Sequence, residues 1–241
     1  MEKITNKKMG IAALSAILLL AVMVSIVPVA TADHSPGHKE QGGPPSDPGE
    51  IMDCDVSSPI TGGIIDASIR VPDGETCYIN STSYLNNLVI NGNVIAGSGS
   101  MLFIETMNPY IGGSITINGD VKSDGGDQIR ISGISMNPVY INGDVQIKNT
   151  LLGIVVTWAD ITGSAQFENN EQYYSITNTI IGESVQVKDN TADDKWYESI
   201  FAANTISGNL QCKNNDPAPQ LGMFGANTVS GKAQGQCSDL A

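Results

Sequence analysis

The chain has few basic residues and few histidines, and these shortages exclude several functions. Lys and Arg together number 12 against 25 Asp and Glu, which gives a formal net charge of −13. This balance argues against nucleic acid and anionic lipid headgroups as partners. The two histidines, His34 and His38, lie in a segment rich in Pro and Gly. Because no histidine follows them, Ser-His-Asp chemistry is excluded from the region expected to fold.

Cysteine is also scarce, and its four copies show no Cys-x-x-Cys spacing. A zinc site is therefore the disfavoured interpretation. Four cysteines allow three disulfide pairings, and disulfides imply an oxidising compartment. We prefer Cys54–Cys77 and Cys212–Cys237, because these pairs fall at the two ends of the repeats described below, where they would hold the terminal coils. Each would close a loop of about 25 residues and contribute about 3 kcal/mol.

Two segments precede the region expected to fold. Residues 1–32 carry three lysines, an apolar run and Ala30-Thr31-Ala32, the pattern of a signal peptide cut after Ala32. The alternative is an apolar run that stays as a membrane anchor. Cleavage removes three Lys and one Glu, which leaves a net charge of −15. Residues 33–50 are nearly devoid of apolar side chains, so we expect a disordered linker whose two histidines are solvated rather than metal-bound.

A short motif recurs seven times along the rest of the chain. It consists of a β-branched residue, a spacer, Gly, a small or polar residue and an apolar residue. The copies contain Gly92, Gly119, Gly143, Gly163, Gly182, Gly208 and Gly231. A period near 23 residues is typical of repeat proteins, in which each unit is stable only when stacked on its neighbours. The fifth copy, at 180–185, has one residue more, which predicts a bulge or widened bend at Glu183-Ser184.

The apolar residues around each repeat glycine alternate with polar ones. In one repeat the residues of the same parity are Val139, Ile141, Val145 and Ile147. This period of two, in segments rich in Val and Ile, predicts β-strands. A coil of this length suits two or three short parallel strands, whose crossovers are right-handed. The sequence therefore predicts an all-β domain over 51–241, a single right-handed parallel β-helix of about seven coils. Each Gly would lie at a bend where a positive φ or the next coil excludes Cβ.

Asparagines recur at fixed distances from the repeat glycines. Those four residues before a repeat Gly are Asn178, Asn204 and Asn227, and those six residues after one are Asn149, Asn169 and Asn214. In stacked coils such positions superimpose, and their amides are expected to form hydrogen-bonded ladders. The alternative is that Asn is simply a favourable turn residue, and both explanations can hold together.

The two ends of the repeat region resemble a known group of proteins. The end reads Gly208-Asn209-Leu210-Gln211-Cys212, then Pro217-Ala218-Pro219 and finally Gly235-Gln236-Cys237, and the start contains Val71-Pro72 and Cys77. This pattern, over about residues 51–240, is similar to exported, largely uncharacterised β-helix repeat proteins of bacteria and archaea with a GNLQC…PAP…GQC ending. The resemblance implies an exported β-helix with paired terminal cysteines, and it implies no catalytic residue.

Charged residues offer little for catalysis or metal binding. The two arginines, Arg70 and Arg130, fall in different coils and are expected at the surface. Two groups have carboxylates at loop spacing: Asp124 with Asp127, and Asp189 with Asp193 and Asp194. We favour solvated acidic turns over Ca²⁺ sites for both groups. The sequence therefore predicts no catalytic residue, no metal and no cofactor.

Aromatic residues are candidates for a sugar-stacking platform: Trp158, Trp196, Tyr173, Tyr174 and Tyr197. Trp158 follows an apolar run and is expected to be packed. Trp196 and Tyr197 lie in the polar segment 190–198, which we interpret as a loop, and they are the candidate contact loop. Asn80 begins the sequon Asn80-Ser81-Thr82 and is a candidate for glycosylation in an exported protein.

These observations favour a non-enzymatic protein, secreted or on the cell surface, with a structural, adhesive or interaction role. The expected partner is an envelope protein or a glycan. The alternatives are a carbohydrate-active β-helix enzyme and a module that binds Ca²⁺ or glycan. The enzyme would need clustered carboxylates on one strand face.

Overall fold

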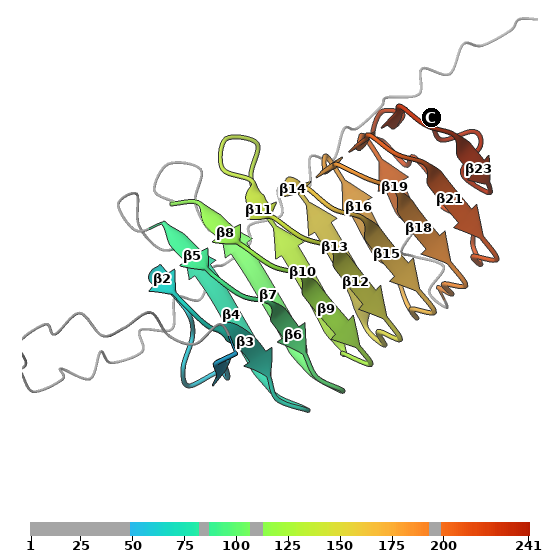
Figure 1. Ribbon diagram of the computed structural model, residues 1–241. Helices are drawn as coiled ribbons and strands as arrows, with labels where there is room; N and C mark the ends of the chain where they lie inside the picture. The colour runs from blue at the N-terminus through green and yellow to red at the C-terminus, as the bar shows by residue number, and fades with distance from the viewer. Residues whose placement is uncertain (1–48, 82–86, 107–112, 193–198) are drawn as a thin grey trace, which may run out of the picture. The chain divides into compact units, whose positions relative to one another are not determined.

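The computed structural model describes residues 49–81, 87–106, 113–192 and 199–241. In these ranges the chain forms strands and turns without a helix, and the strands build three parallel sheets, here called A, B and C. Successive strands lie in sheets C, A and B in turn, so the backbone winds as a β-solenoid (Figure 1). The predicted parallel β-helix is confirmed, whereas the predicted signal peptide and the linker up to residue 48 lie outside the described residues.

Each of the six complete turns contributes one strand to each sheet. Sheet A contains β1 (Ile51–Asp53), β3 (Ser68–Val71), β6 (Val94–Ala96), β9 (Val121–Asp124), β12 (Val145–Lys148), β15 (Ala165–Glu168), β18 (Val185–Lys188), β21 (Leu210–Lys213) and β23 (Ala233–Gly235). Sheet B contains β4 (Thr76–Ser81), β7 (Met101–Thr106), β10 (Gln128–Ser132), β13 (Gly153–Thr157), β16 (Tyr174–Thr177) and β19 (Ile200–Ala202). Sheet C contains β2 (Gly63–Ile65), β5 (Leu88–Ile90), β8 (Ile115–Ile117), β11 (Val139–Ile141), β14 (Ala159–Ile161), β17 (Ile180–Ile181), β20 (Thr205–Ile206) and β22 (Thr228–Val229).

The number of coils differs slightly from the prediction of about seven. Over the described residues, six turns contribute a strand to all three sheets, from β2–β4 to β17–β19. The last two repeats have strands in sheets C and A, and the first of them meets sheet B only through a bridge between Gln220 and Ile200. Each repeat glycine marks a bend between sheets C and A, and these bends continue beyond the last complete turn. The number of repeat glycines is therefore larger than the number of complete turns.

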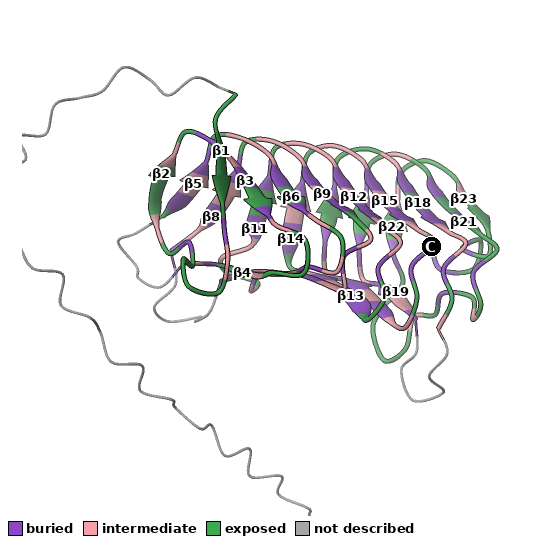
Figure 2. Ribbon diagram, turned by 90° about the horizontal axis from the view of Figure 1, so that it is seen from below, coloured by how far each residue is buried: buried purple, intermediate pink, exposed green. Residues whose placement is uncertain are grey.

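Buried residues occur along the strands of all three sheets (Figure 2), and the apolar ones form a single core cluster. Inward side chains alternate with outward ones on every long strand, and the inward set is mostly Ile, Val and Leu. Val145 and Ile147 are fully buried on β12, as the alternation predicted, and their partners Ala165 and Phe167 are buried on β15. Each buried side chain of this size contributes about 1.5–3 kcal/mol, and stacking supplies the burial that one coil lacks.

The repeat glycines form a column at the bends between sheets C and A. A Cβ on Gly143 would lie 2.5 Å from the carbonyl oxygen of Gly119, and a Cβ on Gly119 would lie 2.5 Å from that of Gly92. Neither residue has a positive φ, so close approach of the preceding coil is the reason for glycine. The first coil places Ala67 in this column, beside Gly92.

The predicted bulge at Glu183-Ser184 is wrong. Ile181 pairs with Ile161 and Val185 pairs with Ala165, so both coils have the same number of residues between these partners. Glu183 takes the glycine place, because its N–H donates to the Gly163 carbonyl oxygen at 3.1 Å. Gly182 therefore lies one position before the column, beside Thr162.

A second bend, between sheets A and B, explains one set of asparagines. Asn149, Asn169, Asp189 and Asn214 all have φ of 54–55° there. Asn and Asp tolerate this left-handed conformation better than other non-glycine residues. The side-chain amide of Asn169 donates to Asn149, and that of Asn214 donates to Asp189 at 2.8 Å. The predicted superposition of Asn149, Asn169 and Asn214 is therefore confirmed, and Asp189 belongs to the same column.

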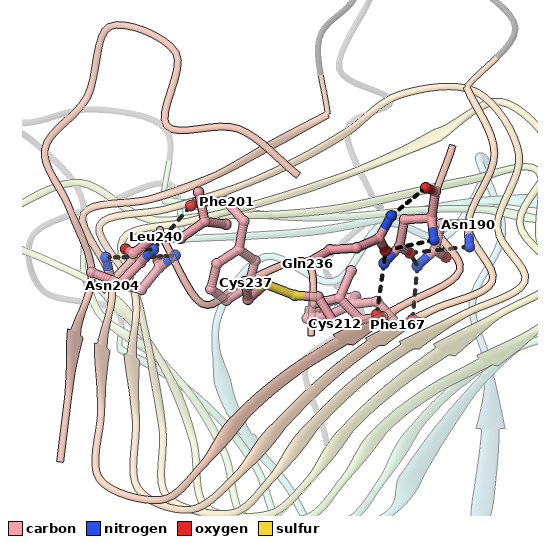
Figure 3. The surroundings of a disulfide bond; sticks show 11 residues. Phe167, Asn190, Phe201, Asn204, Cys212, Gln236, Cys237 and Leu240 are labelled. Carbon is pink, nitrogen blue, oxygen red and sulfur yellow. Dashed lines mark hydrogen bonds between the residues drawn. A yellow bond between two sulfur atoms is a disulfide. The ribbon is translucent and has the colours of Figure 1, made fainter. Parts of the chain in front are cut away.

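Buried amide ladders lie one residue away from some of the predicted positions (Figure 3). The Nδ2 of Asn190 donates to the Oδ1 of Asn215 at 2.9 Å and to the Phe167 carbonyl at 3.0 Å, and Gln236 continues the ladder. On the other side of the core, Asn204 donates to Asn227 at 3.0 Å, as predicted.

The predicted ladder position of Asn178 is wrong. The buried residue in line with Asn204 is Thr179, whose N–H donates to the Oδ1 of Asn204 at 3.0 Å. The cause is the displaced glycine of this repeat: counting back from Gly182 gives 178, whereas counting back from Glu183 gives 179.

Disulfides join Cys54 to Cys77 and Cys212 to Cys237, which confirms the preferred pairing. At the C-terminal end, the carbonyl of Leu240 accepts hydrogen bonds from the N–H and Nδ2 of Asn227, both at 2.8 Å. Leu240 and Cys237 are buried and cover the last coil. In the described part of the chain, no helix has the length and apolar character that a membrane crossing requires.

Candidate functional site

The outer face of sheet A carries a glutamine on each of five successive strands. Gln146, Gln166, Gln186, Gln211 and Gln234 are neighbours in the strand register, one from each coil. Neighbouring strands lie about 4.8 Å apart, so these amides repeat at that interval along the solenoid axis. Further toward the N-terminus the same column continues with Lys122, Ile95 and Arg70.

A column of short polar side chains borders the glutamines on one side. The Oδ1 of Asp120 accepts the backbone N–H of Asp144 at 2.8 Å, and the Oδ1 of Asp144 accepts that of Ser164 at 2.8 Å. Asn93 does the same for Asp120. This contact is the physical reason for the Asn or Asp that follows Gly92, Gly119, Gly143 and Gly208, because it satisfies a backbone donor at the bend.

A column of charged side chains borders the glutamines on the other side. Glu168 lies between Lys188 and Lys148, with N–O distances of 2.9 and 3.3 Å. These two ammonium groups, Lys188 first, hold the pKa of Glu168 below its ordinary value. Hydrogen bonds from Asn214 and then Lys188 lower the pKa of Asp189 in the same way. Both carboxylates therefore remain ionised as structural partners.

Grooves lie between these columns. One groove of about 110 Å³ has a lining that includes Asp144, Gln146, Ser164, Gln166, Ser184 and Gln186. Another, of about 280 Å³, continues along Ile95, Lys122, Asp124 and Lys148. The face is thus a long polar surface with amide, hydroxyl, carboxylate and ammonium groups at regular spacing.

A different groove lies at the corner where sheet B passes to sheet C. We call it the corner groove; it has a volume of about 250 Å³, and its lining includes Pro138, Trp158, Asp160, Asn178, Ile180 and Thr205. Trp158 is 38% exposed and Ile180 is 50% exposed. The prediction that Trp158 is packed is therefore wrong, because the residue forms the corner itself and its ring does not enter the core.

Trp158 has a backbone conformation that is unusual for a bulky residue. Its φ is 50°, and the equivalent residues of the next two coils, Asn178 and Ala203, have φ of 53° and 55°. The left-handed region costs a non-glycine residue about 1–2 kcal/mol and suits Asn far better than Trp. The corner fold therefore does not require tryptophan at this place.

None of the other predicted contact residues named below lies at a described, exposed position. Trp196 and Tyr197, the candidate contact loop, lie outside the described residues, as do His34 and His38. Tyr174 is 2% exposed and belongs to the core, where burial raises the pKa of its hydroxyl. Tyr174 is therefore not part of a stacking platform.

The candidate glycosylation residue and the arginines lie on strands. Asn80 is a residue of β4 beside Glu105 of β7, and its Oδ1 is buried without a hydrogen bond. Arg70 pairs with Asp53 at 2.7 Å, and Arg130 pairs with Glu105 at 3.0 Å. Both arginines are exposed, as predicted.

Of the two predicted acidic groups, the structure describes Asp124, Asp127 and Asp189. The Oδ1 of Asp124 accepts a hydrogen bond from Asn149 at 2.6 Å, and Asp193 and Asp194 lie outside the described residues. Among the described residues, no three His, Cys, Asp or Glu side chains form a group that could hold a metal ion.

Comparison of the chain with protein-family models, with curated proteins and with solved structures finds no match in any of the three.

Sequence reasoning missed the glutamine column and the exposure of Trp158. The first had a signal, because a glutamine lies three residues after four of the repeat glycines, and Gln186 lies three residues after Glu183. The second had none, because the direction of a corner side chain depends on the left-handed bend, which a single tryptophan does not reveal.

Proposed function

We propose that this protein is exported and acts without catalysis, as a secreted or cell-surface β-solenoid with a structural, adhesive or interaction role. The observation that carries the proposal is the outer face of sheet A, where one glutamine per coil forms a regular polar surface between two ordered columns. Such a surface suits many weak contacts along a repetitive partner, such as an envelope protein or a glycan. The two disulfides suit an oxidising compartment.

The carboxylates on this face support a non-catalytic role. A glycoside hydrolase needs one carboxylic acid with a raised pKa to protonate the leaving group. Hydrogen bonds from lysine, arginine or asparagine lower the pKa values of Asp53, Glu168 and Asp189 instead. For Asp120, burial opposes the change, but Lys122 and the N–H of Asp144 outweigh it and lower the pKa.

The test combines localisation, binding and hydrolysis assays. We expect the full chain, expressed in its own host, to be labelled by a membrane-impermeant biotin reagent, and the purified protein to bind the host's envelope fraction without releasing reducing sugars. The double variant Gln186→Ala/Gln211→Ala should reduce binding at least about tenfold, which is 1.4 kcal/mol. Thr116→Ala/Thr228→Ala, on the outer face of sheet C, is the matched control and should bind normally.

Retention in the cytoplasm, release of reducing ends, or full binding by the glutamine double variant would each contradict the proposal. A melting temperature equal to that of the unaltered protein confirms that the variants are folded.

A further inference from the structure

The corner groove lies away from the glutamine surface and has different chemistry. It combines the exposed indole of Trp158 with a carboxylate (Asp160) of the same coil and with an amide (Asn178) and a hydroxyl (Thr205) of the next two coils. The groove and the glutamine surface share no lining residue. We propose that the corner groove is a binding site for a neutral saccharide.

The geometry supplies two parallel rows of groups. Along the corner, Pro138, Trp158 and Asn178 follow one another, because Val139 pairs with Ala159 and Thr157 pairs with Thr177. Two residues further on in each coil, the outward side chains of sheet C are Asp160 and Ile180. A ligand lying along the axis would meet the indole of Trp158 and the amide of Asn178 on one row. On the other row it would meet Asp160, Ile180 and Thr205.

One wall of the groove is held firmly. The loop 133–138 leaves the corner at Gly133, whose N–H donates to the Thr157 carbonyl at 2.9 Å, and returns at Val139, whose N–H donates to the Trp158 carbonyl at 3.1 Å. The loop is closed by two hydrogen bonds between Ile134 and Asn137, at 3.2 and 3.0 Å. A Cβ on Gly133 would lie 2.1 Å from the Trp158 carbonyl oxygen, so glycine permits this close approach. The groove is therefore formed before any ligand binds.

The position of Trp158 points to a ligand. Residues in sparsely populated backbone regions cluster at binding and catalytic sites, where the surrounding structure maintains them. Here the next coil uses Asn178 at the equivalent corner, which suits the conformation better. An exposed tryptophan in a strained position contributes little to the core, so its ring is the part that requires an explanation.

Saccharide fits this combination better than other ligand classes. A pyranose ring has an apolar C–H face that stacks on an aromatic plane and an edge of hydroxyls that both donate and accept hydrogen bonds, whereas the groove offers one aromatic ring, amide, hydroxyl and carboxylate groups. The carboxylate of Asp160 and the net charge of −13 disfavour an anionic ligand. A quaternary ammonium ligand prefers a cage of several aromatic rings, and one ring lines this groove among the described residues.

The experiment follows tryptophan fluorescence in a Trp196→Phe background, so that Trp158 is the one remaining reporter. The probes are cellohexaose, chitohexaose and mannohexaose, with hexagalacturonate and choline as anionic and cationic comparators. We expect at least one neutral hexasaccharide to shift the emission of Trp158 to the blue. Calorimetry with the same hexasaccharide should confirm binding and give its affinity. Trp158→Asn should keep the fold, because Asn suits the left-handed corner, and should weaken binding measured by calorimetry at least about tenfold. Tyr78→Ala, which removes an exposed aromatic ring from sheet B, is the control and should bind normally.

Three outcomes would overturn the proposal. They are the absence of binding for all three neutral probes, equal binding by the Trp158→Asn variant, and binding of choline or hexagalacturonate alone. The envelope-binding result for the sheet A surface does not enter this test, because the two surfaces have no residue in common.

Discussion

At the scale of single residues, backbone contacts between coils decide which side chains the bends accept. The carbonyl oxygen of one coil lies where the Cβ of the next would begin, as at Gly119 and Gly143. Glu183 shows that one coil accepts a side chain in this column, with its carboxylate accepting a hydrogen bond from Ser164 at 2.8 Å. Substitution of a repeat glycine is therefore expected to strain the contact between two coils and not to prevent folding.

Gly143→Ala should lower the free energy of unfolding by about 2 kcal/mol, since the added methyl group overlaps the Gly119 carbonyl and forces the coils apart. Urea denaturation measures the change. Gly225→Ala is the matched control: its Cβ would meet nothing within 4 Å, so its stability should stay within about 0.5 kcal/mol of the unaltered protein. Equal effects of the two substitutions would contradict the close-approach explanation.

Asn190→Ala should cost about 3 kcal/mol, because it leaves the buried Phe167 carbonyl and the buried Asn170 N–H without their partner. Asn118→Ala removes a comparable ladder contact, from its Nδ2 to the Oδ1 of Asn91 at 2.7 Å, but at an exposed position. Water replaces that contact, so the control should cost less than about 1 kcal/mol. Thermal unfolding of both variants tests whether burial of the ladder sets its contribution.

At the scale of strands, each coil adds one member to every outward column. The charged column of sheet A depends on ionised carboxylates, because Glu168 of β15 bridges the lysines of β12 and β18. A carboxyl group with a pKa lower in the folded state than in the unfolded state stabilises the fold at pH above its unfolded value, near 4.3. This contribution is lost as the pH falls through the folded value.

Glu168→Gln should therefore lower the free energy of unfolding at pH 7 by less than about 1 kcal/mol, the range for exposed ion pairs. As the pH falls through the folded pKa of Glu168, which lies below its ordinary value, the difference from the unaltered protein should shrink toward zero, because protonation of Glu168 removes the same contacts. Urea denaturation at pH 7 and pH 3 measures this. Glu171→Gln, at an exposed position, is the control. A deficit for Glu168→Gln that does not shrink as the pH falls would refute the electrostatic cause.

The strands and the core were predictable because alternation of apolar residues reflects burial directly. The bends were less predictable, because their register depends on backbone contacts between coils. Ala67 and Glu183 belong to the glycine column, yet neither is glycine, so the first copy was missed and the fifth was misaligned by one residue. The same error moved the predicted ladder from Thr179 to Asn178. In the candidate site, the glutamine column could have been predicted from the spacing of the glutamines in the sequence. The exposure of Trp158 could not, because it depends on the left-handed bend at the corner.

At the scale of the whole molecule, the two ends differ from the middle because their outer coils have a neighbour on one side alone. Stability in such arrays is close to a sum over coils and their contacts, so the ends open first. One disulfide lies at each end of the stack, Cys54–Cys77 at the N-terminal end and Cys212–Cys237 at the C-terminal end. The covalent links are therefore placed where noncovalent contacts between coils are fewest.

Replacing both cysteines of one pair by serine should cost about 3 kcal/mol, as the chain-entropy model gives for loops of this length. Hydrogen exchange should accelerate in the coils next to the lost disulfide, whereas β12 and β15 in the middle should keep their protection. Cys212→Ser/Cys237→Ser and Cys54→Ser/Cys77→Ser serve as reciprocal controls, each affecting its own end. Uniform acceleration along the whole chain would contradict this modular behaviour.

The coils 145–164 and 165–184 have equal length, since Val145 pairs with Ala165 and Ala165 pairs with Val185. Either one is thus a cassette that can be duplicated in tandem without changing any bend. Each duplication would add one glutamine to the row and raise the valency of the surface by one. Under the proposed function, gene duplication could adjust the reach of this protein along a repetitive partner in steps of a single coil, with the terminal disulfides left unchanged.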